Sequence, residues 1–221
     1  MSPDRHNHHI VVIPDSGNRG HGATGLSRYL AGLRLESHVF QYAWREWTID
    51  RAAVMLATFV DVNVVEHDSV RSVSLVGLGV GSLVLRYFLT HYELLPARRC
   101  IIVADPYHGS DAYRSRRAGW LARWRYGAAL PQLMEGPGGF PANCGVPPIP
   151  FGVLVTGTVL PEGVGRVQDA TVAESIYTAP QLLAQARDVH CERSSCARAV
   201  HKAHVRDLIS TFLLHGWFVE N

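Results

Sequence analysis

A short apolar segment that passes through alternating glycines into a helical pattern is the feature that most constrains this fold. Residues 72–76 read as a strand, and residues 80–91 read as a helix. The connection between them is Gly77-Leu78-Gly79-Val80-Gly81. Glycines at this spacing permit a tight turn and a close approach of the helix to the strand. The segment therefore predicts a strand that turns directly into a helix.

The rest of the chain repeats this alternation of strand and helix. The last segment carries an apolar stripe at helical spacing, formed by Val205, Leu208, Ile209, Phe212 and Leu213. Such alternation predicts an α/β fold of three layers, a mostly parallel sheet with helices on both faces, whose ligands bind at the carboxyl ends of the strands. Further strands are predicted at 9–13, 37–43, 99–104 and 151–156, further helices at 26–33 and 52–65, and a Gly-rich turn at 15–25.

Length and charge exclude several classes of protein. The 221 residues suffice for one α/β domain, so residues 1–221 are expected to form a single domain. A formal net charge of +2 gives no electrostatic argument for a nucleic-acid partner. No apolar run approaches the ~18 residues of a membrane-spanning helix, and the polar N-terminus lacks the apolar stretch of a secretory signal. We therefore expect a cytoplasmic protein without a membrane span.

No motif for a metal ion or a cofactor is present. The four cysteines match no zinc or Cys-x-x-Cys spacing. His6, His8 and His9 could bind a metal ion adventitiously, but a frayed polar terminus is the simpler interpretation. We therefore expect neither a resident metal nor a cofactor.

One stretch interrupts the alternation, and we interpret it as a short cap inserted at about residues 111–148. It is rich in glycine and proline and contains a basic portion with two tryptophans. Trp120 and Trp124 share one face of a helix at i, i+4 spacing and would form the wall of an apolar pocket beside Gly79. Basic and aromatic residues in alternation also suit single-stranded nucleic acid, but a cap helix with a solvated arginine face is the better interpretation.

The turn at 77–81 is also the setting of the G-x-S-x-G nucleophile elbow, in which a serine stands where the strand meets the helix. The central residue here is Gly79, which has no side chain that could attack a substrate. The sequence therefore predicts the scaffold of an elbow and argues against serine hydrolysis at that position.

With these residues in view, the chain resembles small bacterial lipases and esterases of the α/β-hydrolase superfamily over nearly its whole length. The resemblance implies an α/β-hydrolase-like three-layer sandwich with a short cap. It rests on segments that occur in the family's order, namely the strand and turn at 9–17, the helix start at 81–86, the segment 106–110, the cap at 120–133 and the C-terminal ending at 212–218.

The same resemblance implies that the catalytic triad is degenerate. Gly79 stands at the nucleophile position, and the register of the last helix puts Cys196 at the position of the histidine. A thiol does not replace an imidazole as general base, because its unperturbed pKa is ~8.5 and its thiolate is first a nucleophile. His190 is the fallback base, on the strand that precedes Cys196.

The acid of the triad has two alignments. In the first, the segment 169–172 resembles the family's acid segment, and Asp169 is the acid. In the second, the segment 163–167 takes that place, which puts Val164 at the acid position with Glu162 nearby. The sequence leaves both open.

The oxyanion hole is made of backbone N–H groups and does not depend on the triad. The resemblance assigns it to Ser16 and Val80. Asp15 stands where the family has a glycine, and Asp105 where it has a threonine, so two carboxylates are added at strand ends. These two and the loop residue His108 are candidates for proton transfer, although capping roles for the carboxylates and a solvated histidine are the simpler alternatives.

Three functions follow as hypotheses. The first is a repurposed enzyme that binds a small apolar, carbonyl-containing molecule and catalyses a non-hydrolytic step, such as cyclisation, elimination or isomerisation, in specialised metabolism. The second is a non-catalytic pseudo-hydrolase that binds a ligand or a protein partner. The third is a residual lipase or esterase that uses another nucleophile, for which Ser82 and Cys196 are the candidates.

Overall fold

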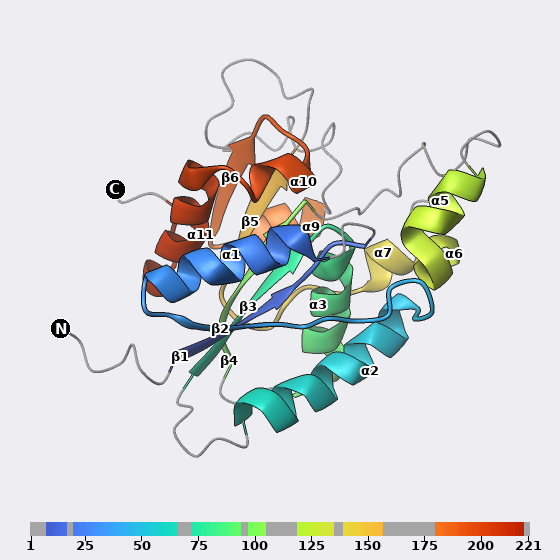
Figure 1. The fold of residues 1–221 in the computed structure, drawn as a ribbon, viewed down its shortest axis with the longest axis horizontal. Coiled ribbons are helices and arrows are strands. Elements are labelled where there is room, and N and C mark those ends of the chain that lie inside the picture. Colours follow the sequence, from blue (N-terminus) through green and yellow to red (C-terminus); the bar gives the residue numbers. More distant parts are fainter. Residues whose placement is uncertain are drawn as a thin grey trace.

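Six parallel strands form the centre of the molecule (Figure 1). The computed structural model describes residues 8–16, 20–65, 72–93, 97–104, 119–134, 139–156 and 180–218. The strand order is β2-β1-β3-β4-β5-β6. Their bounds are β1 (His8–Ile13), β2 (Glu36–Val39), β3 (Ser72–Leu78), β4 (Ala97–Val103), β5 (Phe151–Thr156) and β6 (Asp188–Glu192).

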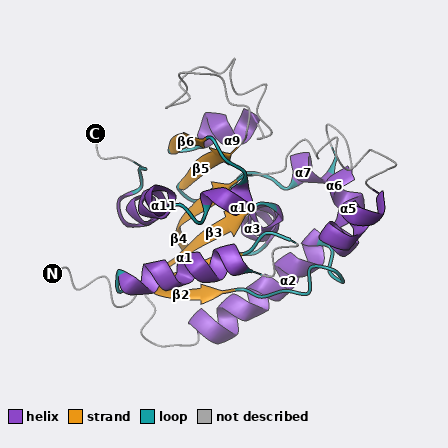
Figure 2. Ribbon diagram, turned by 45° about the horizontal axis from the view of Figure 1, so that its top comes forward, coloured by secondary structure: helices purple, strands orange, loops and turns teal. Residues whose placement is uncertain are grey.

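Helices cover both faces of this sheet, which gives the three layers seen in Figure 2. One face packs on α1 (His21–Gly32), α10 (Cys196–Ala199) and α11 (Ala203–His215). The other packs on α2 (Ile49–Val60), which continues into η2 (Asp61–Val65), on α3 (Val80–His91) and on α9 (Pro180–Gln185). None of the helices among the described residues is long and apolar enough to cross a lipid bilayer.

Strand β1 shows why the sequence forms this arrangement. Its apolar residues are all buried, and they alternate between the two faces: Ile10 and Val12 face α1, while Val11 and Ile13 face α2 and α3. A strand buried on both faces reads as a continuous apolar run, and such strands are typical of parallel sheets. The predicted α/β fold with a parallel sheet is confirmed.

The cap lies at one end of the three layers (Figure 1). Its described elements are α5 (Gly119–Tyr126), η3 (Gly127–Ala129), α6 (Leu130–Met134) and α7 (Phe140–Asn143).

The predicted elements match the structure closely at β3, α3 and β5 and differ elsewhere by a few residues. The largest difference is α1, which begins at His21 rather than at residue 26. We interpreted this segment as a turn because glycine disfavours helices. In the structure Gly20, with φ 72, precedes the helix, and Gly22 is buried within its first turn.

The order of the strands locates the candidate site. The chain leaves β1 toward β2 on one side and returns to β3 on the other side. Parallel sheets bind ligands where the strand order reverses in this way, at the carboxyl ends of the two strands that meet there. Asp15 follows β1, and Gly79 follows β3, so both residues lie at this switch point.

Candidate functional site

Gly79 forms a sharp turn between β3 and α3. Its backbone has φ 54 and ψ −121, a conformation that residues with a side chain rarely adopt. Its N–H donates to the carbonyl of Val103 (2.9 Å), and its carbonyl accepts from the N–H of Ser82 (2.9 Å). The elbow geometry is therefore present although the nucleophile is not.

Packing explains the glycines on either side of the turn. A Cβ at Gly77 would lie 2.7 Å from Ser82 Cα, and one at Gly81 would lie 2.5 Å from the carbonyl oxygen of Ile13. The helix thus approaches both β3 and β1 more closely than a side chain would permit.

Ser82 serves this same contact. Its hydroxyl is fully buried, 2.8 Å from the carbonyl oxygen of Gly77 and 3.0 Å from that of Val103. These contacts tie α3 to β3 and β4, and they give Ser82 a structural role.

The carboxylate of Asp15 occupies the space in which the side chain of a nucleophile would stand. A Cβ at Gly79 would lie 2.5 Å from Asp15 Cγ. Asp15 Oδ1 accepts a hydrogen bond of 3.0 Å from the backbone N–H of Val80, the first residue of α3. Free N–H groups and the positive end of the helix dipole favour an anion at this position. The N–H expected to form half of the oxyanion hole therefore binds a carboxylate of the protein itself.

Two further side chains lie next to Asp15. Ser16 is buried, and its hydroxyl has no hydrogen-bond partner among the described residues. Tyr42 donates from its hydroxyl to the carbonyl of Pro14 (3.3 Å). Burial and the nearby charge of Asp15 raise the pKa of Tyr42, so its hydroxyl stays protonated. The sequence pattern places Tyr42 inside the strand predicted at 37–43, whereas β2 ends at Val39 and Tyr42 lies in the loop that follows it.

Cys196 lies near Asp15, at the start of α10. The two residues line one small cavity together with Leu78, Gly20 and Val200. Its volume is only ≈ 10 Å³, about the space of a single water molecule. We predicted a pocket of ordinary ligand size here, walled by Trp120 and Trp124. Neither tryptophan lines this small cavity, and the pocket of ligand size beside Gly79 stays a prediction.

A buried carboxylate fixes the segment that carries Cys196. Glu192 ends β6 and accepts hydrogen bonds from Ser194 (2.9 Å), Lys202 (2.6 Å) and His204 (2.6 Å). Burial alone would raise the pKa of Glu192, but these hydrogen bonds outweigh it and lower the pKa to about 2. The carboxylate is therefore ionised at neutral pH and joins the end of β6 to the residues before α10 and to the start of α11.

His190 lies away from the elbow. It is in register with Leu154 of β5, on a strand three places from β3, which corresponds to a separation of about 14 Å. Its ring is 6.2 Å from that of Phe218, and burial lowers its pKa. His190 is not placed to act as a base at position 79.

Three of the predicted site residues, Asp105, His108 and Asp169, lie outside the described residues, as do Val164 and Glu162. Their roles remain predictions. The described residues around Gly79 also contain no group of three metal-binding side chains.

The larger cavity lies under the cap. It has a volume of ≈ 610 Å³. Trp124 lines it, whereas Trp120, which is 71% exposed, does not. We call this cavity the cap groove, lined by Arg45, Arg123, Trp124, Gly127, Ala128, Leu130, Pro131 and Met134.

Hydrogen bonds fix both walls of the cap groove. The N–H of Ala128 donates to the carbonyl of Arg45 (3.1 Å), which joins η3 to the loop after β2. Gln132 of α6 accepts from the N–H of Ile49 (2.7 Å) and donates to Asp50 Oδ1 (2.7 Å) at the start of α2. The Arg45 guanidinium lies 5.4 Å from the centre of the Trp124 ring, within cation–π range.

Comparisons with known proteins identify the fold. No family model matches the sequence, and no curated protein is similar to it. An esterase from Pyrococcus furiosus superimposes with a TM-score of 0.60 at 10% identity, covering 97% of this chain and 84% of that one. A lipase-esterase related protein from Clostridium acetobutylicum has a TM-score of 0.56 at 11% identity, covering 93% and 94%. A bromoperoxidase from Bacillus anthracis has a TM-score of 0.54 at 12% identity, covering 94% and 92%. These likenesses show the fold alone, which is α/β-hydrolase-like.

Proposed function

We propose that this chain is a non-catalytic pseudo-hydrolase that binds an amphiphilic anion in the cap groove. The observation that carries the first half of this proposal is the hydrogen bond between Val80 N–H and Asp15 Oδ1.

An oxyanion hole works by leaving N–H groups free for the charge that develops on a substrate oxygen. At Val80 this N–H is bound to a carboxylate, and a substrate carbonyl would have to displace that anion. The cavity next to it has room for about one water molecule. Ester hydrolysis lacks its nucleophile, because Gly79 has no side chain. Polarisation of a carbonyl lacks the N–H of Val80, because that group is bound to Asp15.

The second half of the proposal rests on the lining of the cap groove. Trp124, Leu130 and Met134 offer apolar contacts, and Trp124 and Met134 are 58% and 44% exposed. Arg45 and Arg123 add two cations, and no acidic residue is among the described lining residues. Guanidinium groups bind carboxylates in two-point hydrogen bonds. An apolar chain with one anionic head, such as a fatty acid, matches both features.

The volume of the cap groove supports the same ligand class. At ≈ 610 Å³ it lies within the range of about 300–1,000 Å³ that small-molecule sites occupy. A fatty acid also carries a carbonyl group on an apolar chain, two features of the ligand class expected from the sequence.

Titration with dodecanoate, followed by calorimetry, tests the binding half of the proposal. We expect saturable binding that weakens about tenfold or more in Trp124→Ala and in Arg45→Ala, because each removes a wall of the cap groove. Trp217→Ala is the matched control, since Trp217 is also partly exposed but lies outside the cap groove. Equal affinities in all variants would refute the site.

Incubation with short-chain p-nitrophenyl esters and a fluorophosphonate probe tests the non-catalytic half. We expect neither turnover nor covalent labelling. Robust turnover together with a labelled serine would refute it.

A second candidate function is acid–base catalysis by Asp15 without hydrolysis. It is favoured by the position of Asp15 next to the protonated Tyr42 hydroxyl and in one cavity with Cys196. Asp15→Asn distinguishes the two functions: it would abolish a chemical conversion that depends on a carboxylate base and leave dodecanoate binding unchanged.

A further inference from the structure

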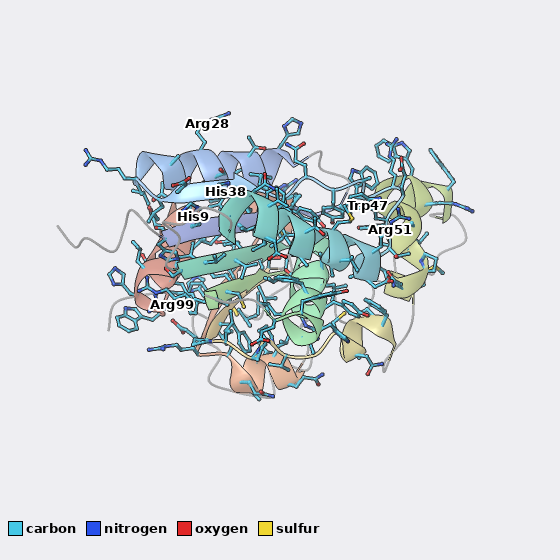
Figure 3. All side chains as sticks on the ribbon, turned by 90° about the horizontal axis from the view of Figure 1, so that it is seen from below. His9, Arg28, His38, Trp47, Arg51 and Arg99 are labelled. Carbon is cyan, nitrogen blue, oxygen red and sulfur yellow. The ribbon has the colours of Figure 1, made fainter. Side chains whose placement is uncertain are left out.

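Three side chains on β1 and β2 form a cluster that the elbow and the cap groove do not use. They are His9, Glu36 and His38, and Figure 3 shows both histidines at the sheet end away from α5 and α6. The geometry points to a binding site for a zinc-class divalent cation in this cluster. This inference does not depend on the proposed function.

The pairing of the two strands brings these residues together. β1 and β2 are parallel, with His9 opposite Glu36 and Val11 opposite His38. Side chains alternate along a strand, so Glu36 and His38 share one face, and their partner His9 points to the same face. The three donors therefore lie close together at the amino-terminal ends of β1 and β2.

The distances between the donor atoms are close to those of a metal site. His9 Nδ1 is 3.0 Å from His38 Nε2, and Glu36 Oε1 is 3.9 Å from the same nitrogen. One donor atom from each residue lies within 4.8 Å of the other two. A tetrahedral ion with bonds of about 2.0–2.1 Å needs donors about 3.3 Å apart. Small rotations of the side chains bring the three atoms to that spacing.

The burial of the cluster suits a bound cation with one open position. The His9 side chain is only 4% exposed, that of His38 is 23% exposed, and that of Glu36 is 57% exposed. The strand backbone thus fixes one ligand rigidly, while the carboxylate can close over an ion from the solvent side. Two imidazoles and one carboxylate with a water molecule at the fourth position form a zinc site of a common kind.

The neighbouring His8 is not part of the cluster. Its Nε2 is hydrogen-bonded to Ser74 Oγ (2.9 Å) on the opposite face of the sheet. Burial, together with the charges of Arg98 and Arg99, lowers the pKa of His8 to about 4.

The site would stabilise the edge of the sheet. β2 is a strand of four residues at the edge of the described sheet, where its one neighbouring strand is β1. An ion held by one residue of β1 and two of β2 would join the strands through their side chains in addition to their backbone hydrogen bonds.

Zinc titration of the full chain, purified without an added histidine tag and treated with a chelator, tests this inference. We expect one Zn²⁺ per chain, measured by competition with a chromophoric chelator, and a higher melting temperature with zinc. Glu36→Gln and His38→Ala should each weaken binding by roughly 100-fold or more, since loss of an outer-shell partner alone costs about 10–100-fold. Glu36 is exposed, so Glu36→Gln keeps the inference testable if His38→Ala fails to fold.

Two controls separate this site from adventitious binding. His91→Ala removes an exposed histidine elsewhere and should leave zinc binding unchanged. His6→Ala should also leave it unchanged. Loss of binding in His6→Ala alone, unchanged affinity in Glu36→Gln and His38→Ala, or equal binding of Mg²⁺ would overturn the inference.

Discussion

Replacing Gly79 by alanine tests the claim that Asp15 occupies the place of the nucleophile. The new Cβ would lie 2.5 Å from Asp15 Cγ, so the carboxylate must move and release the N–H of Val80. Loss of a hydrogen bond to a charged group costs about 1.5–3 kcal/mol. A residue with a side chain at this positive φ adds strain of about 1–3 kcal/mol. We therefore expect Gly79→Ala to lower the free energy of unfolding by about 2.5–6 kcal/mol.

A double-mutant cycle isolates the contribution of the carboxylate. Asp15→Ala alone should cost about 1.5–3 kcal/mol, because it removes the same hydrogen bond. In Asp15→Ala/Gly79→Ala that hydrogen bond is lost only once, so the double variant should be more stable than the sum of the single changes by about 1.5–3 kcal/mol. Asp15→Asn is the matched control: it keeps the volume of the side chain, so the clash with position 79 should persist.

Urea denaturation at 25 °C, monitored by far-ultraviolet circular dichroism, supplies the four free energies. Independent sites are additive within about 0.5 kcal/mol. Additivity within that limit would show that position 79 and Asp15 do not compete for one space, and the assignment of Asp15 to the nucleophile position would be refuted.

Three further outcomes are expected. The double variant Gly79→Ser with Cys196→His should remain inactive on p-nitrophenyl acetate. Adding Asp15→Gly should raise its rate of hydrolysis by a factor within the ~10²–10⁴-fold of general-base catalysis. Activity in the double variant would show that Asp15 does not block the site. Ser82→Ala should lower the free energy of unfolding by about 0.5–1.5 kcal/mol without changing dodecanoate affinity, because it removes a buried hydrogen bond while the Val103 carbonyl keeps its bond from the N–H of Gly79. A loss below about 0.5 kcal/mol in urea would contradict this. Because the pKa of Glu192 is lowered from 4.5 to about 2, its contribution of roughly 3 kcal/mol is complete above pH 4.5 and is lost as the pH falls toward 2. Glu192→Gln should flatten that acid limb of the stability profile, and an unchanged limb would assign the loss to other carboxylates.

The elements of the sheet were predictable because their signals are local. The run 72–78 and the helix 80–91 carry their pattern within a single stretch of chain, and the glycines of the turn mark the boundary between them. The boundaries of α1 were harder, because glycines that disfavour a helix in isolation are tolerated where the helix packs closely on the sheet.

The candidate site was predictable only in part. Gly79 can be read from the sequence, and the register of the last helix placed Cys196 at the same end of the sheet as Asp15. The contact between Asp15 and Val80 depends on how β1 and β3 pair, and the two residues are 65 positions apart. The cluster of His9, Glu36 and His38 was likewise not predictable, because it depends on how β1 and β2 pair. His9 and His38 are 29 positions apart and form no local motif.

The G-x-S-x-G motif usually combines two requirements, a helix packed closely on the sheet and a nucleophile at the turn. In this chain the close approach of α3 to β1 and β3 is kept without the nucleophile. Gly77 and Gly81 are needed wherever a helix lies this near to a sheet, whatever the central residue does. In evolution, the nucleophile can therefore be exchanged without dismantling the framework around it, and a chain can lose a reaction through one codon while it keeps its shape. A pattern search that accepts the two outer glycines as a sign of hydrolase activity would misassign such chains. Hydrolase activity is better judged from the residue that fills the space above the central position of the motif.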